Sequence, residues 1–502
     1  MPADTPAPPS LPLATGQGRL VLALLCFVGF LDFVDASIVN VALPSIQHAL
    51  DLSVQDLQWV PSGYLLTYGG LMLLGGRAGD LLGRRRVLLA GTAIVGLSSL
   101  TGGFAGTSGV LIGSRLAQGA GAALMLPAAL SLLTTTFSSG PDRHKALGAW
   151  GAAGGLASAA GVFLGGVLSQ GPGWRWVFFV NPPACLIILL LVPRLIPDDT
   201  RRPERGKGFD LPGTALVTGG MLLLVYALVK APDQGWDSTR TVGELAAAAA
   251  LLAAFLANEA RAANPLVPPS LVRIRGLGAA NAANLLASAG FLSMFFFATL
   301  YMQEVGHYSQ IESGSAFLPI TVGAGLAAGL SPKLFAKIGT RPVIVAGALV
   351  AAGGVLLLSR VPVHGSYPAD LLPGFLVMSF GLGMVFVGAA TAANAGVPQD
   401  QAGLAAALLN TSQQLGGALG LAILSAVSTA RVHHRLDQGT DQATALAGGI
   451  RRALLVGSLF LVVGAVVALR AANTRGEPEA SADPGTPDRT DGAAAPHETV
   501  AQ

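Results

Sequence analysis

The chain has 502 residues, of which 52% are hydrophobic and 11% are charged, with a formal net charge of +3 and a mean hydropathy of +0.60. Soluble domains carry about 25% charged residues, so the composition excludes a water-soluble protein and predicts an all-α integral membrane protein in a lipid bilayer. Strand-like alternation is absent, which argues against a barrel, and the basic residues are divided among loops, so no nucleic-acid partner is expected.

Apolar runs of about 20 residues are long enough for helices that cross a bilayer core of about 30 Å. Residues 1–19 and 472–502 are poor in apolar pattern and predict disordered tails. The chain between them predicts fourteen membrane helices, at about residues 20–44, 59–76, 87–105, 110–134, 146–168, 177–192, 211–229, 242–258, 277–302, 316–330, 343–358, 371–396, 402–428 and 453–471.

The first helix carries two carboxylates, Asp32 and Asp35, near its middle. Residues three apart share a helix face, and a mid-membrane carboxylate costs at least about 2.5–3.5 kcal/mol on insertion scales. Both side chains are therefore expected to face the protein interior or a water-filled cavity. We interpret at least one as a protonation site; the alternative is a structural carboxylate held by arginine or backbone groups.

The turn between the second and third helices has the spacing Gly-x-x-x-Asp-x-x-Gly-Arg-Arg, formed by Gly76, Asp80, Gly83, Arg84 and Arg85. Glycine lets the backbone turn sharply, and arginines mark the cytoplasmic face. An Asp80–arginine pair at a helix end could break and re-form as helices tilt. The alternative is a plain positively charged loop.

Arg115 is the only basic residue well inside an apolar helix of the first half. Its guanidinium cannot lose its proton, so it needs a partner, and Asp35 and Asp32 are the candidates. A change in this pairing could load or release a proton. The alternative is a static ion pair that holds the first and fourth helices together.

The fifth helix is dense in glycine, including Gly161, Gly165 and Gly166, and Gly151 with Gly155 repeats the small-xxx-small spacing. This spacing lets membrane helices pack backbone to backbone. It predicts either a sliding interface between two halves or ordinary tight packing, and the spacing does not separate the two.

A basic linker begins at residue 193 and divides the chain. The turn at residues 331–341 resembles a worn copy of the first glycine-arginine turn: Gly339 falls 256 residues after Gly83, and Ala336 stands in the place of Asp80. We therefore expect two related six-helix bundles, residues 20–192 and 276–471. Residues 193–275 would hold the cytoplasmic linker, two inserted helices and a return loop.

The distribution of Lys and Arg among the loops favours cytoplasmic termini by about two to one. The predicted loop between the last two helices contradicts this rule because it contains Arg431, Arg435, Arg451 and Arg452. The preceding cytoplasmic loop, by contrast, has no Lys or Arg.

These motifs together resemble the major facilitator superfamily, specifically its fourteen-helix drug:proton antiporters, over about residues 20–470. Residues 76–86 are similar to the family's loop motif, residues 111–121 to its fourth-helix motif, and residues 35–44 to its first-helix motif, with Asp35 as the motif carboxylate and Asp32 as an addition. The helix-5 antiporter motif, Gly-Pro-x-x-Gly-Gly, is present at residues 161–166 without its proline.

The resemblance implies alternating access of two bundles, coupled to inward proton flow, with export of a small amphipathic drug across a bacterial cytoplasmic membrane. Asp35 or Asp32 would bind the proton and Arg115 would tune it. The cavity between the bundles would be lined by apolar and amide groups, such as Asn281, Asn284, Asn410 and Gln414. No cofactor beyond the proton gradient and no partner subunit is implied.

Two other functions are considered. An uptake symporter on the same fold is the alternative, and the missing helix-5 proline makes it less remote. A membrane-embedded enzyme or sensor is disfavoured, because the histidines fall in predicted loops, helix ends or the tail, and no linker is long enough for a soluble domain. Cys26 and Cys185 lie far apart in apolar segments, which predicts neither a disulfide nor a metal site.

Overall fold

The computed structural model describes residues 12–137, 141–197, 210–262, 265–266, 274, 276–395, 397 and 402–475, and within them the chain forms helices joined by short turns and loops. The first half contains α1 (Gly16–Leu50), α2 (Val54–Leu57), α3 (Trp59–Leu82), α4 (Arg84–Gly103), α5 (Ser108–Thr136), α6 (Pro141–Gln170), α7 (Trp176–Phe179) and α8 (Asn181–Leu195). Then follow α9 (Leu211–Gln234) and α10 (Thr239–Glu259). The second half contains α12 (Leu277–Leu300), η1 (Tyr301–Val305), α13 (Gln310–Ala316), α14 (Leu318–Ile338), α15 (Thr340–Leu358), η2 (Tyr367–Leu371), α16 (Leu372–Asn394), α17 (Ala402–Asp437) and α18 (Gln442–Ala468).

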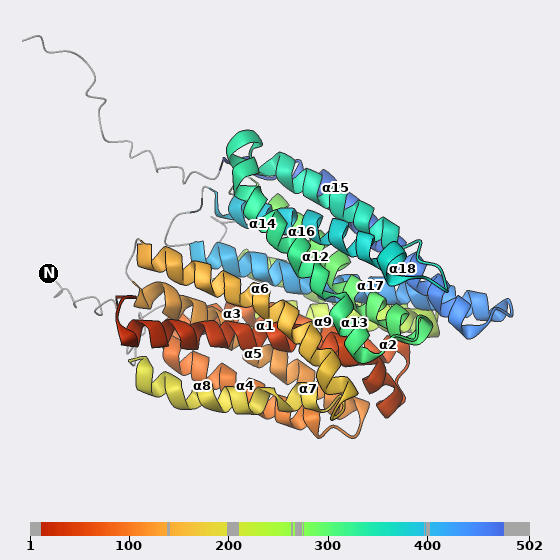
Figure 1. Cartoon of the computed structure of the whole chain (residues 1–502), viewed down its shortest axis with the longest axis horizontal. Coiled ribbons are helices and arrows are strands. Elements are labelled where there is room, and N and C mark those ends of the chain that lie inside the picture. Colours follow the sequence, from red (N-terminus) through yellow and green to blue (C-terminus); the bar gives the residue numbers. More distant parts are fainter. Residues whose placement is uncertain are drawn as a thin grey trace, which may run out of the picture.

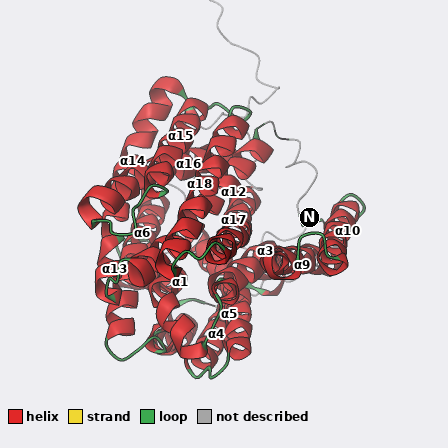
Figure 2. Cartoon of the chain, turned by 90° about the vertical axis from the view of Figure 1, so that its right-hand side faces the viewer, coloured by secondary structure: helices red, strands yellow, loops and turns green. Residues whose placement is uncertain are grey.

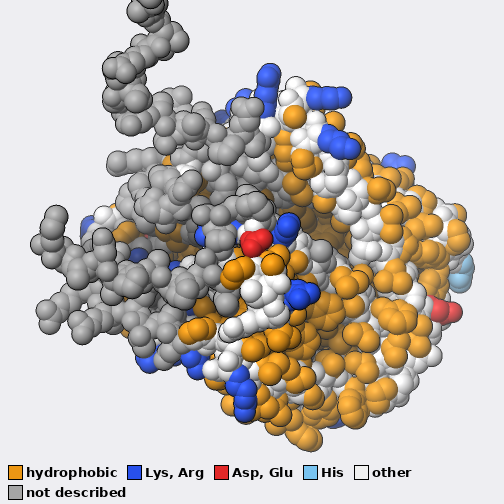
Figure 3. All heavy atoms as spheres, turned by 60° about the vertical axis from the view of Figure 1, so that its left-hand side comes forward, with side chains coloured by type: hydrophobic (Ala, Val, Ile, Leu, Met, Phe, Trp, Pro, Cys, Tyr) orange, Lys and Arg blue, Asp and Glu red, His pale blue; other side chains and the backbone are white. Residues whose placement is uncertain are grey.

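Twelve spans within the described residues are long and apolar enough to cross a membrane. The predicted second and fifth spans fall outside this set, although α3 and α6 are 24 and 30 residues long. Four polar residues of α3 are buried in the protein interior: Ser62, Tyr64, Thr67 and Tyr68. Elsewhere hydrophobic side chains dominate the visible surface, and Lys and Arg interrupt it only in places (Figure 3).

The helices form two groups with the inserted pair at one side (Figures 1 and 2). In the first group α5 packs against α3 and α4, and α1 packs against α6. In the second, α12 packs against α17 and α18, and α15 packs against α16. The inserted helix α9 contacts both groups, through α3 and α17, and α10 packs on α9.

Each of the two glycine-containing turns has its glycine at a positive φ. Gly83 separates α3 from α4 with a φ of 95°, and Gly339 separates α14 from α15 with a φ of 84°. Only glycine adopts this conformation without strain. The repeat detected in the sequence therefore corresponds to a repeated structural element.

Several helix ends differ from the predicted ones. α1 continues through Pro44 to Leu50, because a proline close to a helix end removes only one hydrogen bond. α17 extends to Asp437 and α18 begins at Gln442, so the four arginines predicted in the intervening loop lie on helices instead. Residues 472–474, predicted as part of the tail, bond to the second turn: Thr340 N donates to Thr474 O at 2.9 Å.

At the end of the molecule opposite the termini, the two halves are joined by polar contacts. The His48 Nε2 and Glu304 Oε1 atoms are 3.0 Å apart. Gln303 Nε2 donates to Val41 O at 3.0 Å, and Gln310 Nε2 donates to Ser45 Oγ at 3.3 Å. These contacts close that end.

At the end that carries the termini, α6 and α14 diverge (Figure 1). Gly148 and Gly151 on α6, and Gly325 and Gly329 on α14, have open space where a Cβ atom would stand. Nearer the closed end α6 packs instead against α13, the short helix that precedes α14: Gly166 meets Gln310, and Gly314 lies near Val162 O. The two halves are therefore held together at one end, through α6 and α13, and α6 and α14 separate toward the other end.

We predict that a Ser45→Cys/Gln310→Cys pair, in a Cys26→Ala/Cys185→Ala background, cross-links readily in detergent. A Gly151→Cys/Gly325→Cys pair should cross-link poorly under the same conditions, because these positions lie on the diverging ends. Gel mobility after treatment with a short bifunctional maleimide measures both. Equal cross-linking of the two pairs would contradict the one-sided closure.

Candidate functional site

Asp35, on α1, lies at the centre of a buried polar cluster in the first half and is 2% exposed. Its Oδ2 atom is 3.2 Å from Arg115 Nη1 on α5. Its Oδ1 atom accepts from Gln118 Nε2 at 2.6 Å and from Asn181 Nδ2 at the start of α8. Both carboxylate oxygens are thus bonded, and the negative charge is matched by one arginine.

Arg115 is 1% exposed and is held on several sides. Its Nε atom donates to Val60 O at 3.0 Å, and its Nη1 atom donates to Gln118 Oε1 at 2.7 Å. The guanidinium carbon lies 4.2 Å from the centre of the Tyr64 ring, in a cation–π arrangement. These contacts fix the guanidinium in one position.

Asp32 lies on α1, is 3% exposed and has a different environment. The Tyr68 hydroxyl donates to Oδ2 at 2.8 Å and the Tyr64 hydroxyl donates to Oδ1 at 3.4 Å. Among the described residues no Lys or Arg forms an ion pair with Asp32. The two carboxylates therefore differ: Asp35 has a cationic partner and Asp32 has only neutral donors.

The structure brings together all three residues that the sequence singled out as proton-coupling, Asp32, Asp35 and Arg115. The sequence analysis missed four of their partners, namely Tyr64, Tyr68, Gln118 and Asn181. Gln118 follows Arg115 by three residues and thus shares its helix face, a signal that was available. Asn181 precedes two prolines at the start of α8, and nothing in the sequence connects it to Asp35.

The glycines of α6, the helix predicted as the fifth membrane span, contact two different partners. A Cβ atom on Gly161 would collide with Ser37 Oγ, and one on Gly165 with Ile38 O, both on α1. A Cβ atom on Gly166 would lie 2.6 Å from Gln310 O on α13, in the other half. Gly161 and Gly165 therefore pack within the first half, and Gly166 packs across the closed end.

The amide side chains predicted to line a cavity fall into two pairs. Asn281 Oδ1 accepts from Ser412 Oγ at 3.0 Å, and Asn284 Nδ2 donates to Leu409 O at 3.0 Å. Both of these amides are buried and tie α12 to α17. Asn410 and Gln414 are half-buried on α17, and Gln414 packs beside Gly69 of α3 in the other half.

The structure describes part of the first glycine-arginine turn, residues 76–86. Gly76 has open space where a Cβ atom would stand, and Arg85 Nη2 donates to Pro193 O at 3.3 Å. Arg84 begins α4 directly after Gly83. The Asp80 side chain lies outside the described residues.

Within the described residues, no group of three His, Cys, Asp or Glu side chains could hold a metal ion. A buried carboxylate–arginine cluster inside one of two repeated helix bundles is typical of a membrane transporter. It can change the charge of one half when a proton binds or leaves.

Comparisons with known proteins agree. The Major Facilitator Superfamily model matches residues 25–421. The chain is 39% identical to the puromycin resistance protein pur8 of Streptomyces alboniger, over 86% of each chain. It is 39% identical to the cephamycin export protein CmcT of Amycolatopsis lactamdurans, over 82% of this chain and 86% of that one.

Solved structures show the same fold. A bacterial homologue of the human lysosomal transporter Spinster, in an inward-facing and occupied conformation, has a TM-score of 0.66 and 15% identity, covering 91% of this chain and 97% of that one. A peptide transporter of the POT type has a TM-score of 0.63 and 16% identity, covering 90% and 95%. The chain belongs to the Major Facilitator Superfamily and is a membrane transporter, not an enzyme.

We predict that Arg115→Gln lowers the free energy of unfolding by about 3–5 kcal/mol, because it leaves a buried carboxylate without its cation. The double variant Asp35→Asn/Arg115→Gln should recover part of this loss. Denaturant unfolding in mild detergent measures both. A double variant less stable than Arg115→Gln alone would contradict the pairing.

We predict that Gly166→Ala weakens the closed end, because the new methyl group would overlap backbone atoms of Gln310 and Ile311. In the Ser45→Cys/Gln310→Cys protein it should reduce cross-linking. Gly151→Ala, where no atom lies within 4 Å of the new methyl group, is the matched control and should leave cross-linking unchanged. Equal effects of the two substitutions would contradict this role of Gly166.

Proposed function

We propose that this transporter exports amphipathic antibiotics or drugs across a bacterial cytoplasmic membrane in exchange for protons. Relatives at 35–39% identity are named for resistance to or export of puromycin, cephamycin and tetracenomycin C. The buried Asp32–Asp35–Arg115 cluster supports the proton-coupling part of the proposal, because intramembrane carboxylates mark proton pathways. The protein works as a monomer and needs no cofactor beyond the proton gradient.

The Lys and Arg distribution supports cytoplasmic termini. With that orientation the open end faces the cytoplasm, and the His48–Glu304 end faces outwards. Drug enters from the cytoplasm between the diverging ends of α6 and α14. Export then requires the contacts at the closed end to break and the opposite ends to meet.

Within the cluster, we assign different roles to the two carboxylates. Asp35 stays ionised, because Arg115, Gln118 and Asn181 all donate to it and match its charge. Asp32 exchanges the proton, because its neighbours are neutral phenols and an unpaired buried charge is costly. Tyr64 links the two, since it donates to Asp32 and stacks on Arg115.

For the drug site, Asn410 and Gln414 are the amide candidates, because their side chains are half-buried on the α17 face near α3. Asn281 and Asn284 support this site indirectly by holding α12 against α17.

We predict that cells expressing the wild-type protein expel ethidium, and that a protonophore abolishes this efflux. Asp32→Asn should abolish the protonophore-sensitive efflux, because no proton can load. Asp35→Asn should also impair efflux, because it releases Arg115. Asp51→Asn changes an exposed carboxylate and is the matched control, expected to behave as wild type.

Full protonophore-sensitive efflux by Asp32→Asn would overturn the assignment of the proton site. Protonophore-sensitive accumulation of ethidium, instead of efflux, would favour an uptake symporter on the same fold.

A further inference from the structure

A recess of about 680 Å³ lies between α17, α18 and the turn joining α9 to α10, and four arginines line it. Arg431 and Arg435 project from α17, and Arg451 and Arg452 project from α18. Figure 1 shows the joined ends of α17 and α18 projecting at the end opposite the N-terminus. The recess is therefore far from the Asp32–Asp35–Arg115 cluster. Its four arginines are the ones that contradict the loop distribution of Lys and Arg expected for cytoplasmic termini.

The four guanidinium groups are not neutralised within the described protein: none forms an ion pair with a described carboxylate. Asp441, in the turn between the two helices, accepts from Thr444 N at 2.9 Å and so caps α18. Glu244 pairs with Arg240 at 2.9 Å. Like charges in one recess repel one another, so the arrangement is favoured when an anion enters.

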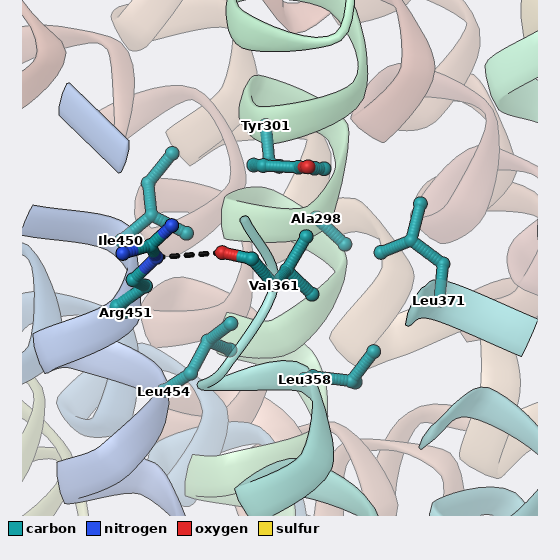
Figure 4. Close-up of a pocket in the computed structure, with 8 residues that line it drawn as sticks. All are labelled: Ala298, Tyr301, Leu358, Val361, Leu371, Ile450, Arg451 and Leu454. Carbon is teal, nitrogen blue, oxygen red and sulfur yellow. Dashed lines mark hydrogen bonds between the residues drawn. The ribbon is translucent and has the colours of Figure 1, made fainter. Parts of the chain in front are cut away.

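Contacts with the protein hold two of the arginines in the recess. Arg451 Nε donates to Val361 O at 2.6 Å (Figure 4). The Arg435 guanidinium lies over Gly448 of α18, where a Cβ atom would be 3.6 Å from Nε. The cations of α17 and α18 thus lie side by side. Arginine forks suit the paired oxygens of phosphate groups.

The surroundings of the recess indicate an amphiphile rather than a free ion. Trp236, which lines it, is 51% exposed, and tryptophan is enriched at headgroup level. Below the cations, α18 presents one continuous apolar face toward lipid. Its exposed residues are Leu455, Leu459, Val462, Val463 and Val466.

We infer that this recess binds the phosphate group of an anionic phospholipid from the leaflet at the closed end, with the acyl chains along the exposed face of α18. The four arginines contact the phosphate, and Trp236 contacts the headgroup region. Because Trp236 lies in the turn that joins α9 to α10, the inserted pair contributes one residue to the lipid site. The bound lipid joins the inserted pair to the second bundle.

The test measures binding of short-chain phosphatidylglycerol to the purified full-length protein by native mass spectrometry, with phosphatidylcholine as the zwitterionic reference. Arg431→Gln/Arg452→Gln should weaken phosphatidylglycerol binding by about 30-fold, from the usual worth of two juxtamembrane cations. Arg175→Gln/Arg240→Gln removes two charges from the same end outside the recess and should retain wild-type binding.

If both double variants weakened phosphatidylglycerol binding equally, binding would depend only on the overall charge of the protein, and the proposed site would be wrong. Equal binding of phosphatidylcholine by the wild-type protein would overturn the requirement for an anionic lipid. Displacement of phosphatidylglycerol by equimolar inorganic phosphate would show that the recess binds a free anion, and would contradict the proposal that its ligand is a lipid. The assay contains no drug and no proton gradient, so its outcome is independent of the transport activity.

Discussion

The ion pair between Arg115 and Asp35 is the constraint on which the first bundle depends. A guanidinium cannot be neutralised by losing its proton, so burying it inside the bundle requires a carboxylate and further hydrogen bonds. Asp35, Gln118 and the Val60 carbonyl supply them, and Asn181 completes the carboxylate side. Four helices, α1, α3, α5 and α8, are thereby positioned around one charge. Any change in the charge of this cluster is transmitted to all of them.

Tight packing at the closed end connects the helix that carries this cluster to the second bundle. Gly161 and Gly165 bring α6 against α1, which carries both aspartates, and Gly166 on the same helix meets α13 of the other bundle. A change at Asp32 or Asp35 therefore acts on the helix whose neighbour, α6, closes one end of the molecule. Because α6 and α14 separate toward the other end, the proposed transport cycle would require movement about this contact.

Residue periodicity and motif spacing predicted much of the fold: the membrane class, two related bundles, the inserted pair, and the equivalence of Gly83 and Gly339. They also identified Asp35 and Asp32 as the candidate partners of Arg115, and the structure pairs Arg115 with Asp35. The Asp32 environment could not be predicted, because Tyr64 and Tyr68 come from another helix and their facing depends on tertiary packing. In the sequence, Asn281 and Asn284 could not be distinguished from Asn410 and Gln414, because all four are amides in apolar helices. Only the packed structure shows that the first pair is buried and ties α12 to α17, whereas the second pair is half-buried. Arg431, Arg435, Arg451 and Arg452 were predicted to lie in a loop, because the apolar run ends near residue 428. The helix α17 continues to Asp437, since no Gly or Pro interrupts residues 429–438.

The most direct test of the central claim is infrared difference spectroscopy between low and high pH on the purified protein, which detects the C=O stretch of a protonated carboxyl group. The account predicts a titrating band in the wild-type protein that is lost in Asp32→Asn and retained in Asp35→Asn, because Asp32 exchanges the proton while Asp35 stays paired with Arg115. A band lost in Asp35→Asn and retained in Asp32→Asn would contradict that division of roles.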